Sequence, residues 1–351
     1  MAMIQNNVFQ MPTMGHNGIS NKVISHNNNG FHIPIINDYL RTSSVTLSSG
    51  FKMPVVGLGV FRVEGKGMKE LIIHAIKIGY RHFDCAAKYQ NEEELGDAIA
   101  EAIQRGLVKR EELFITTKLW NSDHGYALEA CKDSLRKLRL DYLDLYLVHF
   151  PVPTKFTGIG KLKSVIGEDG ILDIDTNISL ESTWRGMEDL VSKGLVRSIG
   201  ISNYSLLLTR DCLAYAKIRP AVNQIETHPY FQRASLVKFC QKHGICVTAH
   251  TPLGGSVANT EMFGSVSCLD DPVLMGLADK YKKSVAQIIL RWNIQRNVTV
   301  IPKTSKLERL DQNSHVFDFE LTKEDMDLIK SLDQNQRTNL PGKYWGVDIY
   351  Q

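Results

Sequence analysis

YRHFDCAAKY at residues 80–89 is a short apolar run that ends in polar side chains. Two runs of the same kind follow it, LFITTKLW at 113–120 and LDLYLVHF at 143–150. A segment with helical periodicity comes after each run, a pattern typical of strands that alternate with helices in a parallel sheet. We therefore expect the three runs to be neighbouring strands whose polar residues lie at one edge of the sheet.

The same strand, loop and helix unit repeats along the chain from residue 44 onward. Short apolar runs predict eight strands, at 57–61, 80–84, 113–118, 144–149, 197–201, 221–225, 245–249 and 298–301. Helical periodicity predicts helices at 67–78, 92–104, 124–138, 180–193, 205–216, 232–243, 272–294 and 305–313. Eight such units favour an α/β fold of the (β/α)8 TIM barrel type. SVTLSS (44–49) and MPVVGLG (53–59) predict an antiparallel N-terminal β-hairpin ahead of the barrel.

Two other classes of protein need motifs that this chain lacks. A Rossmann fold needs G-x-G-x-x-G at the first strand-to-helix turn, whereas Gly57-Leu58-Gly59 leads to Arg62 at the third position. A hydrolase with a nucleophile elbow needs G-x-S-x-G, and residues 200–204 read GISNY. His, Cys and acidic residues nowhere have the spacing of metal ligands in the sequence, so no metal is expected.

Composition narrows the class of protein further. The 351 residues are 43% hydrophobic and 23% charged, which is ordinary for a chain with a large buried core. The formal net charge is only +3, with both signs interspersed, so neither nucleic acid nor a membrane is an expected partner. A monomer or a weak dimer is the expected assembly.

The first 42 residues differ from the rest, because they are rich in Asn, His and Gly and have no acidic residue before Asp38. We expect residues 1–42 to be a disordered extension and residues 43–351 to form a single barrel domain. Six scattered cysteines fit a reducing compartment, so the cytoplasm is the expected location, with a plastid as the alternative if residues 1–42 are a transit peptide. Long loops are expected at 150–178 and 251–271, over the C-terminal face of the barrel.

Four polar residues fall at or just beyond the ends of the first three runs, and they are Asp84, Tyr89, Lys118 and His149. Adjacent strands lie about 4.8 Å apart, so these side chains can meet at one rim. Asp84 is expected to hold Lys118 charged, and His149 to position a carbonyl oxygen as a neutral donor. A lysine about 4 Å from a phenol contributes about 4 kcal/mol at an effective dielectric constant of about 20. That energy would lower the pKa of Tyr89 by up to about three units, which makes Tyr89 the expected general acid and base.

These four residues can move protons, but none supplies a hydride, so a reductase at this rim needs a nicotinamide cofactor. Lys303, Lys306 and Arg309 lie where the eighth predicted strand leads into a helix N-terminus, a place that favours phosphate. Basic residues there favour a 2′-phosphate, and hence NADP over NAD. A solvated basic helix face is the alternative interpretation.

Several motifs, in the same order, resemble those of the aldo-keto reductases. They are GYRHFDCAAKYQNEEELG, TTKLWN, LDLYLVHFP, GISNY, NQIETHPY, PLG and IPKTS, and the resemblance covers residues 44–351. It implies a catalytic tetrad of Asp84, Tyr89, Lys118 and His149, with Tyr89 as acid and base. It also implies that NADPH lies extended across the barrel mouth without a Rossmann domain.

The same resemblance implies which residues bind NADPH or NADP+. They are Ser202, Asn203 and Gln224 at the nicotinamide carboxamide, Thr251 and Leu253 at the pyrophosphate, Lys303, Thr304 and Arg309 at the 2′-phosphate, and Asn313 at the adenine. His250 stands where most members carry a tyrosine that stacks on the nicotinamide, and Gln312 where an acidic adenine contact is common. Because imidazole can still stack, we expect altered cofactor affinity rather than loss of activity.

The finer resemblance is to the plant hexose-6-phosphate reductases, through NSDHG, HFPVPTKF, AHTPLGG, MFGSVSCLDDPVL and RTNLPGKYWGVDIY. It implies NADPH-dependent reduction of glucose or mannose 6-phosphate to an alditol 6-phosphate such as sorbitol 6-phosphate. The expected substrate-binding residues are Trp120, His149, Phe150, Lys155 and Trp345, with Lys343 as a second candidate for the phosphate. A broader aldose or xylose reductase is an alternative, and so is a non-catalytic barrel that senses NADPH.

Overall fold

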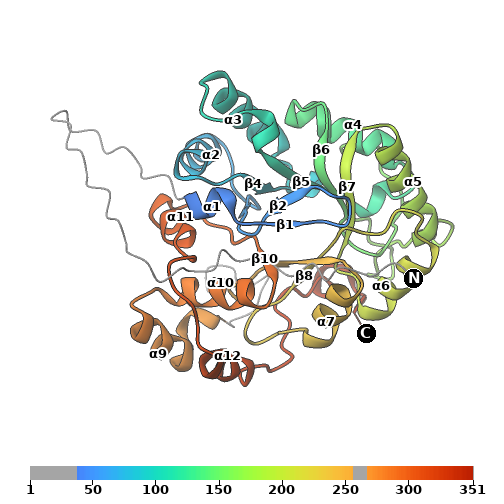
Figure 1. The fold of residues 1–351 in the computed structure, drawn as a ribbon. Coiled ribbons are helices and arrows are strands. Elements are labelled where there is room, and N and C mark those ends of the chain that lie inside the picture. Colours follow the sequence, from blue (N-terminus) through green and yellow to red (C-terminus); the bar gives the residue numbers. More distant parts are fainter. Residues whose placement is uncertain (1–37, 256–266, 351) are drawn as a thin grey trace, which may run out of the picture.

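A parallel sheet with helices outside it forms the body of the molecule (Figure 1). The structure is a computed structural model that describes residues 38–255 and 267–350. The strands of the sheet are β3 (Leu58–Gly59), β4 (His82–Asp84), β5 (Phe114–Leu119), β6 (Leu143–Val148), β7 (Val196–Ser202), β8 (Val222–Glu226), β9 (Cys246–His250) and β10 (Val298–Val300). They pair in sequence order from β3 to β10.

The first and last of these strands close the sheet. Parallel bridges join Val56 to Val300 and Gly59 to Lys303, and the Gly57 amide donates to the Val300 carbonyl at 2.8 Å. Closure satisfies backbone groups that an open edge strand would leave unpaired. The predicted (β/α)8 barrel is therefore confirmed, and each predicted strand overlaps an observed one.

The predicted hairpin consists of β1 (Ser44–Thr46) and β2 (Lys52–Pro54), which are antiparallel. Val45 and Met53 face each other across it and are both buried. The hydroxyl of Ser49 in the connecting turn lies 2.7 Å from that of Ser198, near the start of β7. The hairpin therefore lies against the end of the barrel where the strands begin, opposite the rim where they end.

Helices follow the strands and surround the barrel (Figure 1). The α-helices are α1 (Asp38–Thr42), α2 (Lys66–Ile78), α3 (Glu92–Gln104), α4 (Ala127–Leu138), α5 (Leu180–Ser192), α6 (Leu206–Tyr215), α7 (Ala234–Lys242), α9 (Pro272–Tyr281), α10 (Val285–Gln295), α11 (Leu307–Ser314), α12 (Lys323–Lys330) and α13 (Gly342–Trp345). Short 3-10 helices are η1 (Ala87–Tyr89), η2 (Arg110–Glu112), η3 (Asn121–Asp123) and η5 (Cys268–Asp270). Hydroxyl side chains cap the amino ends of several helices, as Ser179 does for α5 and Thr322 for α12.

Two predicted segments differ from the structure. The helix predicted at 272–294 is in fact two helices, because Lys282 ends α9 in the left-handed conformation at φ 55° and Ser284 starts α10 with a capping box. Residues 38–42, expected to be part of a disordered extension, form α1, and Leu40 packs into the core. The rest of that extension, 1–37, and residues 256–266 of the long loop 251–271 lie outside the described residues.

Three groups of buried apolar side chains stabilise the fold. The largest lies between the barrel strands and the helices around them, and a second packs among α9, α10 and α12. The third, here called the rim cluster, consists of Ala87, Trp120, Phe150, Val152, Leu162, Leu172 and Trp345. The rim cluster joins the C-terminal tail, through Trp345, to the segments that follow β4, β5 and β6. Among the described helices, none is long and apolar enough to cross a membrane.

Candidate active site

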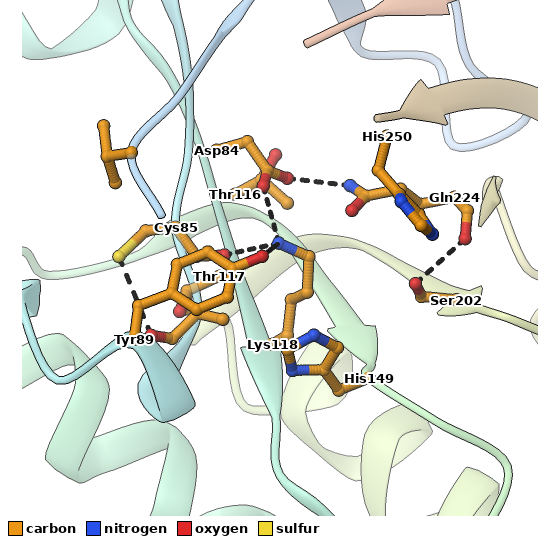
Figure 2. Close-up of polar contacts among 12 residues, drawn as sticks. Asp84, Cys85, Tyr89, Thr116, Thr117, Lys118, His149, Ser202, Gln224 and His250 are labelled. Carbon is orange, nitrogen blue, oxygen red and sulfur yellow. Dashed lines mark hydrogen bonds and ion pairs between the residues drawn. The ribbon is translucent and has the colours of Figure 1, made fainter. Parts of the chain in front are cut away.

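The four residues predicted at the strand ends lie together at one rim of the barrel (Figure 2). Asp84 is the last residue of β4, Lys118 lies near the end of β5, and His149 directly follows β6. Tyr89 lies on η1, the turn that follows β4. Because the three strands run parallel as neighbours, their carboxyl ends meet on one face.

The ammonium of Lys118 is the centre of this group. Its Nζ lies 2.6 Å from Asp84 Oδ1, 2.7 Å from the Cys85 carbonyl oxygen and 3.4 Å from Tyr89 Oη. Both Lys118 and Asp84 are almost fully buried. Burial alone would lower the pKa of Lys118, but Asp84 and Tyr89 outweigh it and the pKa is raised. Lys118 is therefore held charged, as expected from the sequence.

The expected depression of the Tyr89 pKa is wrong in direction. Burial raises the pKa of Tyr89 to about 12, although Lys118 opposes the rise. Burial disfavours the phenolate, and the negative charge of Asp84 offsets part of the effect of Lys118. Tyr89 is therefore protonated at neutral pH, which is the state in which a general acid donates a proton.

His149 is a neutral imidazole beside Tyr89. Burial holds the pKa of His149 well below its usual value, and the nearby charges of Lys118 and Lys88 lower it further. The rings of Tyr89 and His149 lie edge to face, with their centroids 5.9 Å apart. A neutral imidazole can donate a hydrogen bond to a carbonyl oxygen and leave the proton transfer to Tyr89.

The residues expected at the nicotinamide carboxamide lie beside the tetrad and form hydrogen bonds with it and with each other. Gln224 Nε2 donates to Asp84 Oδ2 at 2.7 Å, and Ser202 Oγ donates to the Gln224 carbonyl at 2.9 Å (Figure 2). Asn203, in the left-handed conformation at φ 62°, donates from Nδ2 to the His149 carbonyl at 2.9 Å. These bonds fix the three polar side chains next to the catalytic groups, and their contact with a cofactor stays a prediction.

His250 lies at the end of β9, where its ring is held by two hydrogen bonds. Its Nε2 lies 3.1 Å from Asn203 Oδ1, and its Nδ1 lies 3.1 Å from Thr251 Oγ1. Burial lowers the pKa of His250 to about 4, with Glu226 opposing, so the ring is neutral at physiological pH. Leu253 packs against two of the buried clusters. The structure thus brings His250 to the expected place, and stacking on a nicotinamide stays a prediction.

The residues expected at the 2′-phosphate gather where β10 leads into α11. Lys303 and Arg309 are exposed, and no carboxylate within the described ranges pairs with either. Although Lys303 is exposed, partial loss of solvent around its ammonium and then the nearby charge of Arg62 lower its pKa. Thr304 and Asn313 are buried beside them. Cations that lack an anionic partner, next to a hydroxyl and an amide, are a donor set that fits the 2′-phosphate and adenine of NADP.

Three of the predicted substrate residues meet in the rim cluster. The ring of Trp120 lies edge to face with those of His149 and Trp345, at centroid distances of 5.2 and 6.3 Å. The Phe150 ring stacks on the His149 ring at a centroid distance of 5.1 Å and lies edge to face with the Trp345 ring at 5.0 Å. Trp120 Nε1 and His149 Nδ1 are buried without a hydrogen-bond partner among the residues described. Most buried polar groups have a partner, so these two unsatisfied nitrogens mark a polar spot in the aromatic wall beside the tetrad.

The two lysines expected near a substrate phosphate are exposed. Lys155 lies 3.7 Å from Asp173, with 64% of its side chain accessible. Lys343 lies on α13 and is exposed as well. In the described part of the chain, neither ammonium bonds to a residue of the tetrad or of the rim cluster.

Sequence reasoning missed how the C-terminal tail is held at the rim. Glu226, fully buried at the end of β8, accepts from the Thr338 amide at 2.6 Å and the Asn339 amide at 3.0 Å. Burial would raise the pKa of Glu226, but hydrogen bonds from His228 and Thr338 lower it to about 2. Tyr350 Oη then donates to Asn203 Oδ1 at 3.3 Å. A charged residue directly after the predicted strand AVNQI was the available signal, because buried charges are usually paired.

Comparison with known proteins identifies the family. The sequence profile of the aldo/keto reductase family matches residues 57–334. The chain is 67% identical over 308 residues to the NADP-dependent D-sorbitol-6-phosphate dehydrogenase of Malus domestica. This match covers 88% of this chain and 99% of that protein. The chain therefore belongs to the aldo/keto reductase family, as its motifs predicted.

Two other relatives place that similarity in context. A probable NAD(P)H-dependent D-xylose reductase of Neosartorya fischeri is 43% identical over 310 residues, which cover 86% of this chain and 96% of that protein. The solved structure of a Bombyx mori aldo-keto reductase in complex with NADP is 40% identical and has a TM-score of 0.78, over 88% of this chain and 98% of that one. The similarity to the sorbitol-6-phosphate dehydrogenase is thus much higher than to the xylose reductase.

Proposed function

We propose that this chain is an NADPH-dependent reductase that converts the aldehyde of an aldose 6-phosphate into the alcohol of an alditol 6-phosphate. The observation that carries the proposal is the tetrad, in which a protonated Tyr89 lies beside a charged Lys118 and a neutral His149. High identity to a sorbitol-6-phosphate dehydrogenase supports a sugar phosphate as substrate, with glucose or mannose 6-phosphate as the candidates.

The tetrad has the groups that carbonyl reduction requires from the protein. Bound NADPH supplies the hydride. Tyr89 donates its proton to the carbonyl oxygen as negative charge develops there, and Lys118, 3.4 Å from Tyr89 Oη, stabilises the phenolate that remains. Asp84 keeps Lys118 charged and oriented at 2.6 Å. His149 donates a hydrogen bond that orients the carbonyl oxygen, and in the reverse direction Tyr89 acts as the base.

A steady-state comparison of substrates tests the proposal. We expect kcat/KM with NADPH to be about 10- to 100-fold higher for glucose 6-phosphate or mannose 6-phosphate than for glucose or xylose, since a hydrogen bond to a charged group contributes about 1.5–3 kcal/mol. Equal values for phosphorylated and free sugars would favour the broader aldose or xylose reductase. The same panel run with NADH gives the coenzyme preference.

Coenzyme preference is expected to depend on Lys303. The change Lys303→Met removes a cation from the proposed 2′-phosphate site, so KM for NADPH should rise about 10-fold while KM for NADH stays nearly constant. The matched control is Lys330→Met, an exposed lysine at the end of α12. A similar rise for both coenzymes would contradict a contact between Lys303 and the 2′-phosphate.

The cytoplasm is the proposed compartment. All six cysteines are unpaired in the structure, which supports a reducing environment.

A further inference from the structure

Asn91 is a buried polar residue beside the tetrad. It is 1% exposed and directly precedes α3, where an asparagine usually accepts a hydrogen bond from the first turn of its helix. Within the described residues, the Asn91 side chain accepts no such bond from α3. The glutamates that open α3 already complement the partial positive charge of the helix N-terminus. The reason for a buried amide at this position must therefore lie outside the helix.

The Asn91 amide joins two loops at the rim. Its Nδ2 donates to the Val60 carbonyl at 2.8 Å and to the Val63 carbonyl at 2.9 Å, so both N–H groups bind the turn that follows β3. Its Oδ1 accepts from Cys85 Sγ at 3.5 Å, in the segment that follows β4. Because a backbone carbonyl can only accept, these contacts also fix which end of the amide is the nitrogen. Asn91 thus holds the turn after β3 against the segment that carries the proton donor.

The turn formed by residues 60–63 needs such support. The Val63 amide donates to the Val60 carbonyl at 3.1 Å and closes the turn, but Arg62 within it has φ 56°, in the left-handed region. That conformation costs a residue other than glycine about 1–2 kcal/mol. A hydrogen bond contributes about 1 kcal/mol net. The two bonds from Asn91 are therefore of the size needed to keep the turn in this shape.

Phe61 is the side chain through which the turn reaches the tetrad. Its ring centroid lies 4.9 Å from that of Tyr89. Tyr89 is also contacted by Lys118, whose Nζ lies 5.0 Å from the ring centroid, and by the His149 ring at 5.9 Å. Lys118 and His149 lie at the ends of two neighbouring barrel strands and are held by the sheet. Phe61 lies on a loop, whose position depends on the bonds from Asn91.

We propose that Asn91 is a positioning residue for the proton donor: its amide holds the 60–63 turn in place, and the turn holds the Tyr89 ring through Phe61. The assignment rests on Tyr89 as the proton donor of the proposed function, and it is independent of which aldehyde is reduced. Displacement of a reacting group by about 1 Å can lower a rate about 10²-fold. A turn that relaxes away from Tyr89 therefore slows the chemical step and has little effect on substrate binding.

The first test replaces Asn91 by serine, which is as good a residue at the start of a helix but is too short to reach both carbonyls. With NADPH and either glucose 6-phosphate or glyceraldehyde, kcat should fall about 10- to 100-fold, while KM for the aldehyde changes less than about threefold. NADPH with deuterium at the transferred position should give a larger isotope effect on kcat than in the wild type, because product release no longer hides the hydride step. The control Asn177→Ser, at an exposed turn, should match the wild type in all three.

A second variant changes the same contact from the other side. Phe61→Leu keeps an apolar side chain and leaves the hydrogen bonds of Asn91 in place, so we expect a similar loss of kcat and a similar rise in the isotope effect. If Asn91 acts through Phe61, the double variant should lose little more than either single variant, since both changes remove one contact. Losses that multiply would show that Asn91 acts by another route, and the assignment would be wrong.

Stability measurements distinguish positioning from a role in folding alone. If Asn91→Ser unfolds at a lower temperature but keeps the wild-type kcat and isotope effect, Asn91 supports the fold and does not position Tyr89. Should Asn91→Ser fail to fold, Phe61→Leu decides the matter, because a wild-type kcat in that variant overturns the assignment.

The proposed function is tested separately from this assignment. A wild type that reduces glyceraldehyde but has no preference for glucose 6-phosphate contradicts the proposed substrate class. The role of Asn91 is then still decided by the kcat and isotope effect measured with glyceraldehyde.

Discussion

Replacement of Tyr89 by phenylalanine is expected to lower kcat with glucose 6-phosphate and NADPH by about 10²- to 10⁴-fold, the usual contribution of a positioned general acid. The change removes the proton donor and leaves Lys118 bonded to Asp84 and to the Cys85 carbonyl, at 2.6 and 2.7 Å. The ring itself still packs against Phe61, at a centroid distance of 4.9 Å. We therefore expect a folded protein that binds NADPH with unchanged affinity and turns over slowly.

Two measurements make this prediction specific. NADPH binding, followed by its fluorescence, should give the same Kd for Tyr89→Phe and the wild type. Tyr126→Phe is the matched control, because Tyr126 is an exposed phenol whose ring stacks on Phe156, and its kcat should be normal. A wild type that binds NADPH but reduces no aldehyde would favour the non-catalytic sensing barrel. Near-normal kcat in Tyr89→Phe would show that another group donates the proton.

Replacement of Lys118 by methionine is expected to affect both stability and activity. The ion pair with Asp84 is buried, with side-chain exposures of 0% and 2%. Removal of one partner leaves an uncompensated charge, which typically costs about 3–5 kcal/mol of folding free energy. Activity should also fall, since no cation then stabilises the Tyr89 phenolate. Urea denaturation and steady-state kinetics measure the two effects.

A double variant separates the two effects. Asp84→Asn combined with Lys118→Met removes both charges, and the new amide can still accept from Gln224 Nε2, now 2.7 Å from Asp84 Oδ2. Much of the lost stability should return, because no unpaired charge remains buried. The kcat should stay low, because Lys118 is still missing. If the double variant is as unstable as Lys118→Met alone, the loss comes from packing or from the Cys85 carbonyl rather than from the Asp84 charge.

Local features of the sequence were sufficient for the strands and for the tetrad. Apolar residues recur about every two residues in a strand and every 3.6 residues in a helix, so each segment shows its own type. Parallel strands necessarily bring their carboxyl ends to one face. Asp84, Lys118 and His149 therefore had to meet once neighbouring strands were assumed. The break between α9 and α10 was missed although Ser284 and Gln287 have the spacing of a capping box. That signal was present in the sequence and was outweighed by continuous apolar periodicity.

Properties that depend on burial could not be obtained in this way. The sequence indicated that Lys118 would lower the pKa of Tyr89, but the sign of the total shift depends on how much solvent the fold removes. The tail is another example, because Glu226 and Thr338 are 112 positions apart. No local pattern connects those two residues, and only their shared burial at the end of β8 does.

The sequence by itself determined the barrel, the family and the meeting of the four tetrad residues at one rim, because these follow from short-range periodicity and from motifs at strand ends. The tertiary structure decided that burial raises the pKa of Tyr89, that Glu226 binds the backbone of the C-terminal tail, and that Lys88 lies half-buried on Trp120 with no carboxylate paired to it in the described part of the chain. Each of these depends on desolvation and on contacts between distant segments. Lys88 and Tyr89 are neighbours in the run that opens the sequence analysis, yet only the packed rim shows that Lys88 bonds to the Leu162 carbonyl while Tyr89 lies beside Lys118.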